Sequence, residues 1–156
     1  MKELARLYYN VLKALNQCNV RYMIVGGFAT NYHGVIRSTI DLDLWVDKKE
    51  NNLEKLFNAF ISMGYNQSSC EEAITSLRKD HLIKIPHDND LVEIMDEHII
   101  RMDFDQAYEN RVESNIDDIT VNVIGLEDLI AAKLKSNRYQ DLDDVRKLEE
   151  YRDQKS

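Results

Sequence analysis

The sequence is poor in residues that define several classes of protein. Among its 156 residues are one proline, five glycines and two cysteines. The cysteines, Cys18 and Cys70, form no C-x-x-C pair, so we expect neither a zinc site nor a disulfide framework, and we predict a reducing, cytoplasmic location. Because so little proline and glycine leaves no room for a long linker, we predict a single domain over residues 1–156.

Long apolar runs and an excess of positive charge are also missing. No stretch approaches the ~18 apolar residues of a membrane-spanning helix, and the N-terminus resembles a charged helix more than a signal peptide. The 20 Lys and Arg residues are outnumbered by 28 Asp and Glu residues, which gives a net charge of −8. Because phosphate neutralisation needs basic surface, this balance disfavours a general nucleic-acid-coating protein and is compatible with carboxylates that bind metal ions.

What the chain does contain is an alternation of helical and strand patterns. Apolar residues three or four apart predict helices over residues 3–17, 28–33, 50–63, 70–79, 103–111, 126–135 and 142–151. Short apolar or alternating runs predict strands over residues 22–25, 39–46, 82–85, 91–95 and 119–124, with an H-D-N-D turn at 87–90. Strands interleaved with helices predict an α+β fold, with an α/β-type mixed sheet flanked by helices. The last five residues are predicted to form a polar tail.

The run over residues 39–46 alternates strictly between two kinds of side chain. Its aliphatic residues are Ile40, Leu42, Leu44 and Val46, and they alternate with Asp41, Asp43 and Trp45. Because side chains of a strand point alternately to opposite faces, this pattern predicts a strand with one buried face and with both aspartates on the other.

Residues 24–46 combine three features that suit phosphate chemistry. A predicted strand ends in Gly26-Gly27, a helix is expected directly afterwards, and the next strand carries Asp41 and Asp43. Glycines let backbone N–H groups approach a ligand closely, and a helix N-terminus attracts phosphate. A divalent cation relieves the repulsion between neighbouring carboxylates, and Mg²⁺ favours one or two carboxylates together with substrate phosphates. The pattern therefore favours metal-assisted phosphoryl or nucleotidyl transfer.

This arrangement resembles the nucleotidyltransferase superfamily, which has the DNA polymerase β-like fold. The family pattern is an apolar strand, Gly-Gly or Gly-Ser, a spacer (here residues 28–40), and Asp-x-Asp on the next strand. The stretch R-S-T-I-D-L-D-L-W-V is similar to small stand-alone bacterial nucleotidyltransferases, which include AbiEii-type toxins. Their closing helices carry a pattern that this chain matches at Lys133, Arg138, Asp141 and Asp144. The resemblance implies a core over about 20–125 and closing helices over about 126–151.

The resemblance also implies an activity and its metal ligands. A nucleoside monophosphate would pass from an NTP to a hydroxyl acceptor, and pyrophosphate would leave. Asp41 and Asp43 would hold two Mg²⁺ ions, with Mn²⁺ as a substitute, and Glu93 would complete one site and activate the attacking hydroxyl. Relatives usually carry Asp at the position of Glu93, so Asp90 and Asp96 are rival candidates for the third carboxylate.

Nucleotide binding would fall to a second set of residues. Gly26 and Gly27 would cradle the triphosphate, with Thr39 beside them, and Arg37 or Lys133 would offset its charge. The implied acceptor is a small molecule, a tRNA end or a protein. No membrane association is expected, and an antitoxin partner or a homo-oligomer is compatible with the family.

Simpler interpretations remain open for the same residues. Asp41 and Asp43 are also what a solvent-facing strand would carry, and Lys133 is also a typical surface charge of a helix. One alternative function is a catalytically silent nucleotidyltransferase fold that binds a nucleotide or a protein. A weaker alternative is an antitoxin-like partner whose acidic face mimics nucleic acid.

Overall fold

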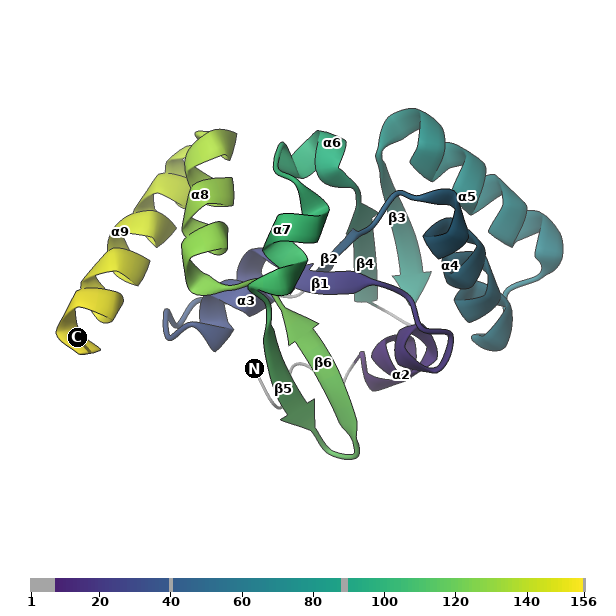
Figure 1. Cartoon of the computed structure of the whole chain (residues 1–156), viewed down its shortest axis with the longest axis horizontal. Helices are drawn as coiled ribbons and strands as arrows, with labels where there is room; N and C mark the ends of the chain where they lie inside the picture. The colour runs from purple at the N-terminus through teal and green to yellow at the C-terminus, as the bar shows by residue number, and fades with distance from the viewer. Residues whose placement is uncertain (1–7, 40, 88–89, 156) are drawn as a thin grey trace.

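A six-stranded mixed sheet forms the centre of the molecule in the computed structural model, which describes residues 8–39, 41–87 and 90–155 (Figure 1). In chain order the strands are β1 (Tyr22–Val25), β2 (Leu42–Val46), β3 (Leu82–His87), β4 (Asp90–Met95), β5 (Val112–Ile116) and β6 (Ile119–Val123). Their order across the sheet is β3-β4-β2-β1-β6-β5. The central strands include parallel pairs, β2 with β4 and β1 with β6, whereas the other three pairs are antiparallel. The predicted α+β fold with a mixed sheet is confirmed.

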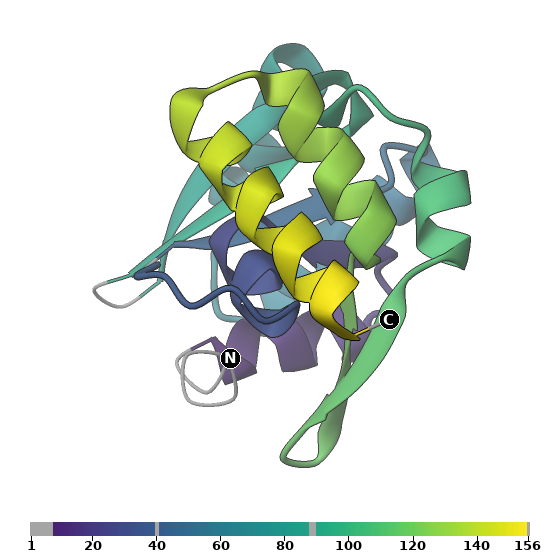
Figure 2. The same ribbon diagram turned by 90° about the vertical axis from the view of Figure 1, so that its left-hand side faces the viewer.

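Helices surround this sheet in two groups (Figures 1 and 2). The described helices are α2 (Tyr9–Gln17), α3 (Gly26–Tyr32), α4 (Glu50–Ser62), α5 (Gln67–Asp80), α6 (Glu97–Ile100), α7 (Phe104–Glu109), α8 (Leu126–Ser136) and α9 (Tyr139–Lys155). The first group consists of α2, α4 and α5. Helix α4 packs against both of the others, and α5 also packs on β3. In the second group α8 packs against α3, α6 and α9. Within the described residues, no helix has both the length and the apolar character that a bilayer crossing requires.

Most predicted elements are present, and several extend further than the sequence pattern indicates. The helix expected from residue 70 begins at Gln67, because the Asn66 side chain caps it by accepting a hydrogen bond from the Ser69 N–H at 2.8 Å. The last helix continues to Lys155, so the predicted polar tail is wrong over its described residues. In this last turn Arg152 forms an ion pair with Glu127 of α8, with an N–O distance of 2.8 Å.

Two short elements, α6 and β5, were not predicted. Helix α6 is a single turn, and its apolar pattern is too short to recognise; Asp96 caps it by accepting a hydrogen bond from the His98 N–H at 2.8 Å. Strand β5 alternates between exposed and partly buried residues and pairs only with β6. The predicted helical residues 3–7, strand residue 40 and turn residues 88–89 lie outside the described residues.

Trp45 corrects the prediction that β2 has one buried face. It was grouped with the two aspartates, yet it is fully buried. Its ring meets the Phe104 ring edge to face, with 5.3 Å between the ring centroids. Helix α7 therefore covers the end of the face on which Asp43 lies, and this face of β2 changes from polar to apolar along the strand.

Buried Asn52, on α4, joins the ends of β1 and β2 that lie away from the double glycine. Its side chain accepts a hydrogen bond from the Arg21 N–H at 2.8 Å and donates to the Arg21 and Asp47 carbonyls at 3.1 and 2.7 Å. One amide thus satisfies backbone groups of two strands and fixes α4 against them.

We predict that Asn52→Ala lowers the free energy of unfolding by about 2–4 kcal/mol, because it leaves buried backbone groups without partners. Urea unfolding measures the difference. Asn58→Ala is the matched control, since Asn58 is exposed on the same helix, and its effect should stay within about 0.5 kcal/mol. Equal losses in the two variants would contradict the role assigned to Asn52.

Candidate functional site

Sheet register brings the double glycine and two carboxylates together. Asp43 of β2 is opposite Val25 of β1 on one side and opposite Glu93 of β4 on the other. Gly26 follows Val25 directly and begins α3. Three neighbouring strands therefore contribute Gly26, Asp43 and Glu93 to one region of the sheet, although the residues are far apart in the sequence.

Asp43 is the most perturbed carboxyl group of this region. Its Oδ1 is buried and has no hydrogen-bond partner among the described residues. Burial raises the pKa of Asp43 to about 8, assisted by a hydrogen bond to Glu93 and by the negative charges of Glu93 and Asp41, while the Lys133 ammonium opposes the shift. The folded structure thus favours the protonated form of Asp43, in which its carboxyl group donates a hydrogen bond to Glu93.

The double glycine is required by the close approach of two side chains. Gly26 has a φ of +67°, and a Cβ atom on it would lie 2.0 Å from Asp43 Oδ2. A Cβ atom on Gly27 would lie 2.4 Å from Thr39 Oγ1. Only glycine leaves room for these side chains, which gives the Gly-Gly pair a structural purpose besides the predicted triphosphate cradle.

A cavity of about 270 Å³ opens beside the coupled carboxyl groups. Gly26, Asp43 and Glu93 line one side of it, and residues of β1, β3, β4, α6, α8 and the start of α9 supply the rest of the wall. Its apolar wall includes Leu82, Met95, Ile99, Ile100, Leu129 and Ala132, and its polar wall includes Arg101, Lys133, Ser136, Arg138 and Asp141. A site of this composition suits a ligand that combines an apolar part with charged groups.

Other predicted site residues lie beside this cavity without lining it. Asp41 precedes β2 and contributes negative charge to the surroundings of Asp43. Gly27, Arg37 and Thr39 are likewise absent from the lining. The structure therefore brings Asp43, Glu93, Gly26 and Lys133 together at one cavity.

Buried ion pairs join the C-terminal helices to the segment after α3. Lys133 Nζ lies 3.0 Å from Asp144 Oδ2 and 3.5 Å from Asp141 Oδ1, and all three side chains are buried. Arg37 also pairs with Asp144. Arg138, whose side chain is 79% exposed, pairs with Asp141 at 2.7 Å.

These contacts change the interpretation of the C-terminal motif. The surface-charge interpretation is wrong for Lys133, because it is only 6% exposed. Arg37 and Lys133, which we predicted to face a triphosphate, both use Asp144 as a partner, so their charges already help to hold α8, α9 and the post-α3 segment together. The C-terminal motif residues therefore form ion pairs that hold these helices together, in addition to any role in binding a ligand.

Glu93 has the best position among the three candidates for the additional carboxylate. Asp96 accepts a hydrogen bond or ion pair from His81 Nδ1 at 2.9 Å and caps α6, and it is not among the residues that line the cavity. The Asp90 side chain lies outside the described part. Lys84 of the edge strand lies 3.4 Å from Glu93 and is a cationic neighbour of it.

The carboxyl pair fits a divalent cation in its donor chemistry. Asp43 and Glu93 provide adjacent carboxylate oxygens, and Asp43 Oδ1 is buried without a partner in the described structure. A cation at this position would supply the missing partner and relieve the repulsion. Within residues 8–39, 41–87 and 90–155, no group of three or more His, Cys, Asp or Glu side chains forms a ready-made metal site, so Asp41 remains a predicted ligand.

Comparison with known proteins gives a family for nearly the whole chain. The profile described as "Nucleotidyl transferase of unknown function (DUF2204)" matches residues 4–156. A search of curated protein sequences finds no match.

Solved structures with the same fold cover most of this chain. A Thermotoga maritima protein assigned as a nucleotidyltransferase is 16% identical, with a TM-score of 0.59, and the alignment covers 93% of this chain and 91% of that one. An antigenic nucleotidyltransferase-like protein from Paracoccidioides brasiliensis is 16% identical, with a TM-score of 0.56 and coverages of 91% and 74%. The lincosamide antibiotic adenylyltransferase LnuA, bound to lincomycin, is 14% identical, with a TM-score of 0.50 and coverages of 92% and 95%. These similarities establish a shared fold.

The raised pKa of Asp43 predicts a particular pH dependence of stability. The folded protein holds a proton up to about pH 8, whereas the unfolded chain loses it near the ordinary Asp pKa of ~3.9. The free energy of unfolding should therefore fall as pH rises through this window. Asp43→Asn should remove this contribution. In the presence of a chelator, the free energy of unfolding of the variant should therefore rise relative to that of the parent, by about 3–5 kcal/mol, as the pH increases from about 5 to about 9.

Urea unfolding of both proteins at several pH values measures this difference. Asp80→Asn is the control, because Asp80 is exposed at the end of α5. Parallel pH profiles for the parent and Asp43→Asn would refute the assignment of a buried, protonated Asp43.

The contact between Gly26 and Asp43 predicts energetic coupling between the two residues. Gly26→Ala should destabilise the fold by at least about 2 kcal/mol, from backbone strain at positive φ and from displacement of Asp43. Gly64→Ala is the control, since Gly64 has a φ of +99° and a Cβ atom there would meet nothing within 4 Å. In double-mutant cycles with Asp43→Ala, the coupling should be at least about 1 kcal/mol for Gly26 and near zero for Gly64. Zero coupling for both glycines would disprove the steric role.

Proposed function

The chain belongs to the family of nucleotidyl transferases of unknown function, and on this premise we propose that it transfers a nucleoside monophosphate from an NTP to a hydroxyl group with the help of Mg²⁺. Mn²⁺ is the expected substitute. The observation that carries the proposal is the buried Asp43 Oδ1, which has no hydrogen-bond partner among the described residues and lies beside Glu93 in the wall of an open cavity. Burying two neighbouring carboxyl groups lowers the stability of the fold unless a cation compensates their charge, so metal binding is the best explanation for the pair.

The proposed reaction is an in-line displacement at the α-phosphorus. The acceptor oxygen forms a bond to phosphorus while the bond from phosphorus to the bridging oxygen of the β-phosphate breaks, and pyrophosphate leaves with the electron pair. In the metal-bound state Asp43 is deprotonated, because metal ligation requires the charged carboxylate. Glu93 then serves as the base that receives the proton of the acceptor hydroxyl.

Asp43, Glu93 and Asp41 are the proposed metal ligands. When bound, the cations neutralise charge on the triphosphate and stabilise the entering and leaving oxygens. Asp43 and Glu93 lie together in the cavity wall, and Asp41 adds charge from the segment before β2. We propose two ions, as the family resemblance implies.

Gly26, Gly27 and Thr39 form the proposed triphosphate side of the site. Gly26 lines the cavity beside Asp43, and Thr39 packs against Gly27. Lys133 contributes positive charge from the cavity wall, whereas Arg37 acts from behind through Asp144. Arg37 is therefore a positioning residue in this proposal.

We rank a small molecule first among the acceptors, ahead of a tRNA end or a protein side chain. The adenylyltransferase LnuA, whose structure holds lincomycin, shares the fold over most of both chains. The apolar wall of the cavity also suits a compact amphiphilic acceptor. A toxin–antitoxin role, with an antitoxin or a second copy as partner, is a secondary proposal that rests on the family resemblance alone.

The function is tested by release of pyrophosphate from each of the four NTPs in the presence of Mg²⁺ and a panel of hydroxyl acceptors. Asp43→Asn and Glu93→Gln should each lower turnover at least about 100-fold, because the lost cation and base contributions are worth several kcal/mol. Glu113→Gln should keep full turnover, since Glu113 is an exposed carboxylate of strand β5, away from the cavity.

Unchanged turnover in both site variants would refute the assignment. Magnesium-dependent NTP binding, measured by calorimetry and followed by no turnover with any acceptor, would instead favour the nucleotide-binding module.

A further inference from the structure

Arg101 differs from the other arginines in its electrostatic environment. In the described ranges of the chain, every other arginine pairs with a carboxylate, as Arg138 does with Asp141 and Arg78 with Glu50. Over the same ranges Arg101 has no such ion pair, and its side chain donates to a backbone carbonyl, that of Lys135. In a protein with a net charge of −8, an arginine without a carboxylate partner is a local exception.

The backbone of Arg101 is held in an unfavourable conformation. It ends α6 with a φ of 63°, which is left-handed and costs energy for a residue other than glycine. Reciprocal contacts fix it there, because Lys135 Nζ donates to the Arg101 carbonyl at 2.6 Å while the Arg101 guanidinium donates to the Lys135 carbonyl. These contacts hold two cationic side chains at the junction of α6 and α8.

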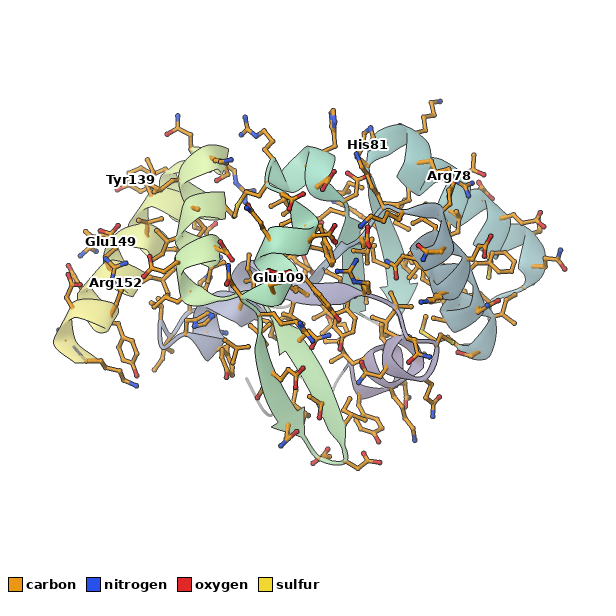
Figure 3. The ribbon with its side chains drawn as sticks, in the orientation of Figure 1. Arg78, His81, Glu109, Tyr139, Glu149 and Arg152 are labelled. Carbon is orange, nitrogen blue, oxygen red and sulfur yellow. The ribbon has the colours of Figure 1, made fainter. Side chains whose placement is uncertain are left out.

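This junction borders two hollows. Arg101 lines the cavity that contains Asp43 and Glu93, and it also lines an open hollow of about 670 Å³. The rest of that hollow is lined by the basic or titratable residues Lys48, His98 and Lys135, by Met102, and by the acidic residues Glu97 and Asp103, of which Glu97 pairs with Lys48 at 3.2 Å. Figures 1 and 3 show α6 and the C-terminal end of α8 facing each other at the top of the molecule. Arg101 therefore lies at the border that the carboxylate cavity shares with the open hollow, and we call this border the cavity mouth.

We propose that Arg101, together with Lys135, forms a phosphate-binding position at this mouth. The guanidinium fork matches phosphate oxygens and is already positioned by its bond to α8, so little conformational freedom is lost on binding. The absence of a carboxylate partner among the described residues means that phosphate need not displace an existing ion pair. The strain at φ 63° fits a side chain whose position is needed for binding.

The proposal deepens the proposed function and rests on it for the identity of the ligand. The phosphate group belongs either to the acceptor, which would then be an anionic molecule, or to the polyphosphate of the NTP. Both sources present a phosphate group to Arg101. Bound NTP would block the binding of free phosphate only if its own polyphosphate occupies the position.

Inorganic phosphate is the probe, titrated into the full chain and followed by the NMR signals of the backbone amides, which report in every variant, and of the arginine side chains. Arg101→Gly removes the cation at a position where glycine tolerates the backbone conformation, and Lys135→Met removes the second charge. Arg78→Gln is the matched control, because Arg78 lies on α5, away from this junction, and pairs with Glu50 (Figure 3). Thermal unfolding confirms that each variant is folded.

In the parent protein, we expect phosphate to shift the Arg101 signal. The dissociation constant for phosphate should rise at least tenfold in Arg101→Gly and severalfold in Lys135→Met, and it should not change in Arg78→Gln. The titration is then repeated with Mg²⁺ and a non-hydrolysable NTP. Phosphate binding that persists beside the NTP assigns the position to the acceptor, and competition assigns it to the polyphosphate.

Phosphate binding that does not depend on Arg101, or no binding to the parent protein, would overturn the proposal. Failure of the NTP analogue to bind, with Arg101-dependent phosphate binding intact, would instead count against the proposed function alone.

Discussion

The site depends on the burial of one carboxyl group against another, Asp43 against Glu93. Two such groups side by side repel when both are charged, and burial makes the charged state of Asp43 still less favourable. Gly26 makes the approach sterically possible, since any Cβ atom there would overlap the Asp43 carboxyl. In the function that we propose, binding of a divalent cation would remove this cost at the cavity wall.

A second buried network gives this carboxyl pair a fixed surrounding. Asp144 receives both Lys133 and Arg37, so one carboxylate joins α8, α9 and the segment that leads into β2. Separating one member from a buried ion network leaves an uncompensated buried charge. The network therefore resists rearrangement, even where its net contribution to stability is small. The ion pairs therefore fix α8 and α9, which form the cavity wall that faces Asp43.

Much of this arrangement follows from local sequence patterns. The strands at 22–25 and 91–95 and the amphipathic helices have clear periodicity, and one residue of each motif, Gly26 and Asp43, lines the candidate cavity. Local patterns could not give the neighbours of β2, because sheet order depends on long-range packing. The family resemblance alone pointed to Glu93, with Asp90 and Asp96 as rivals, and the register places Glu93 beside Asp43. Trp45 was misassigned because alternation says which residues share a face and not whether a distant helix covers it.

Charge distribution shows a similar limit of sequence reasoning. The net charge of −8 disfavours a protein that coats nucleic acid, yet composition says nothing of how the individual charges pair. The described arginines other than Arg101 are matched with carboxylates, so most of their charge is neutralised locally. The excess of acidic residues therefore gives the chain its net charge, while Arg101 and Lys135 place two positive charges at the cavity mouth. An acidic protein can in this way bind a phosphate group, provided that cations remain free of carboxylates at the point where the ligand enters.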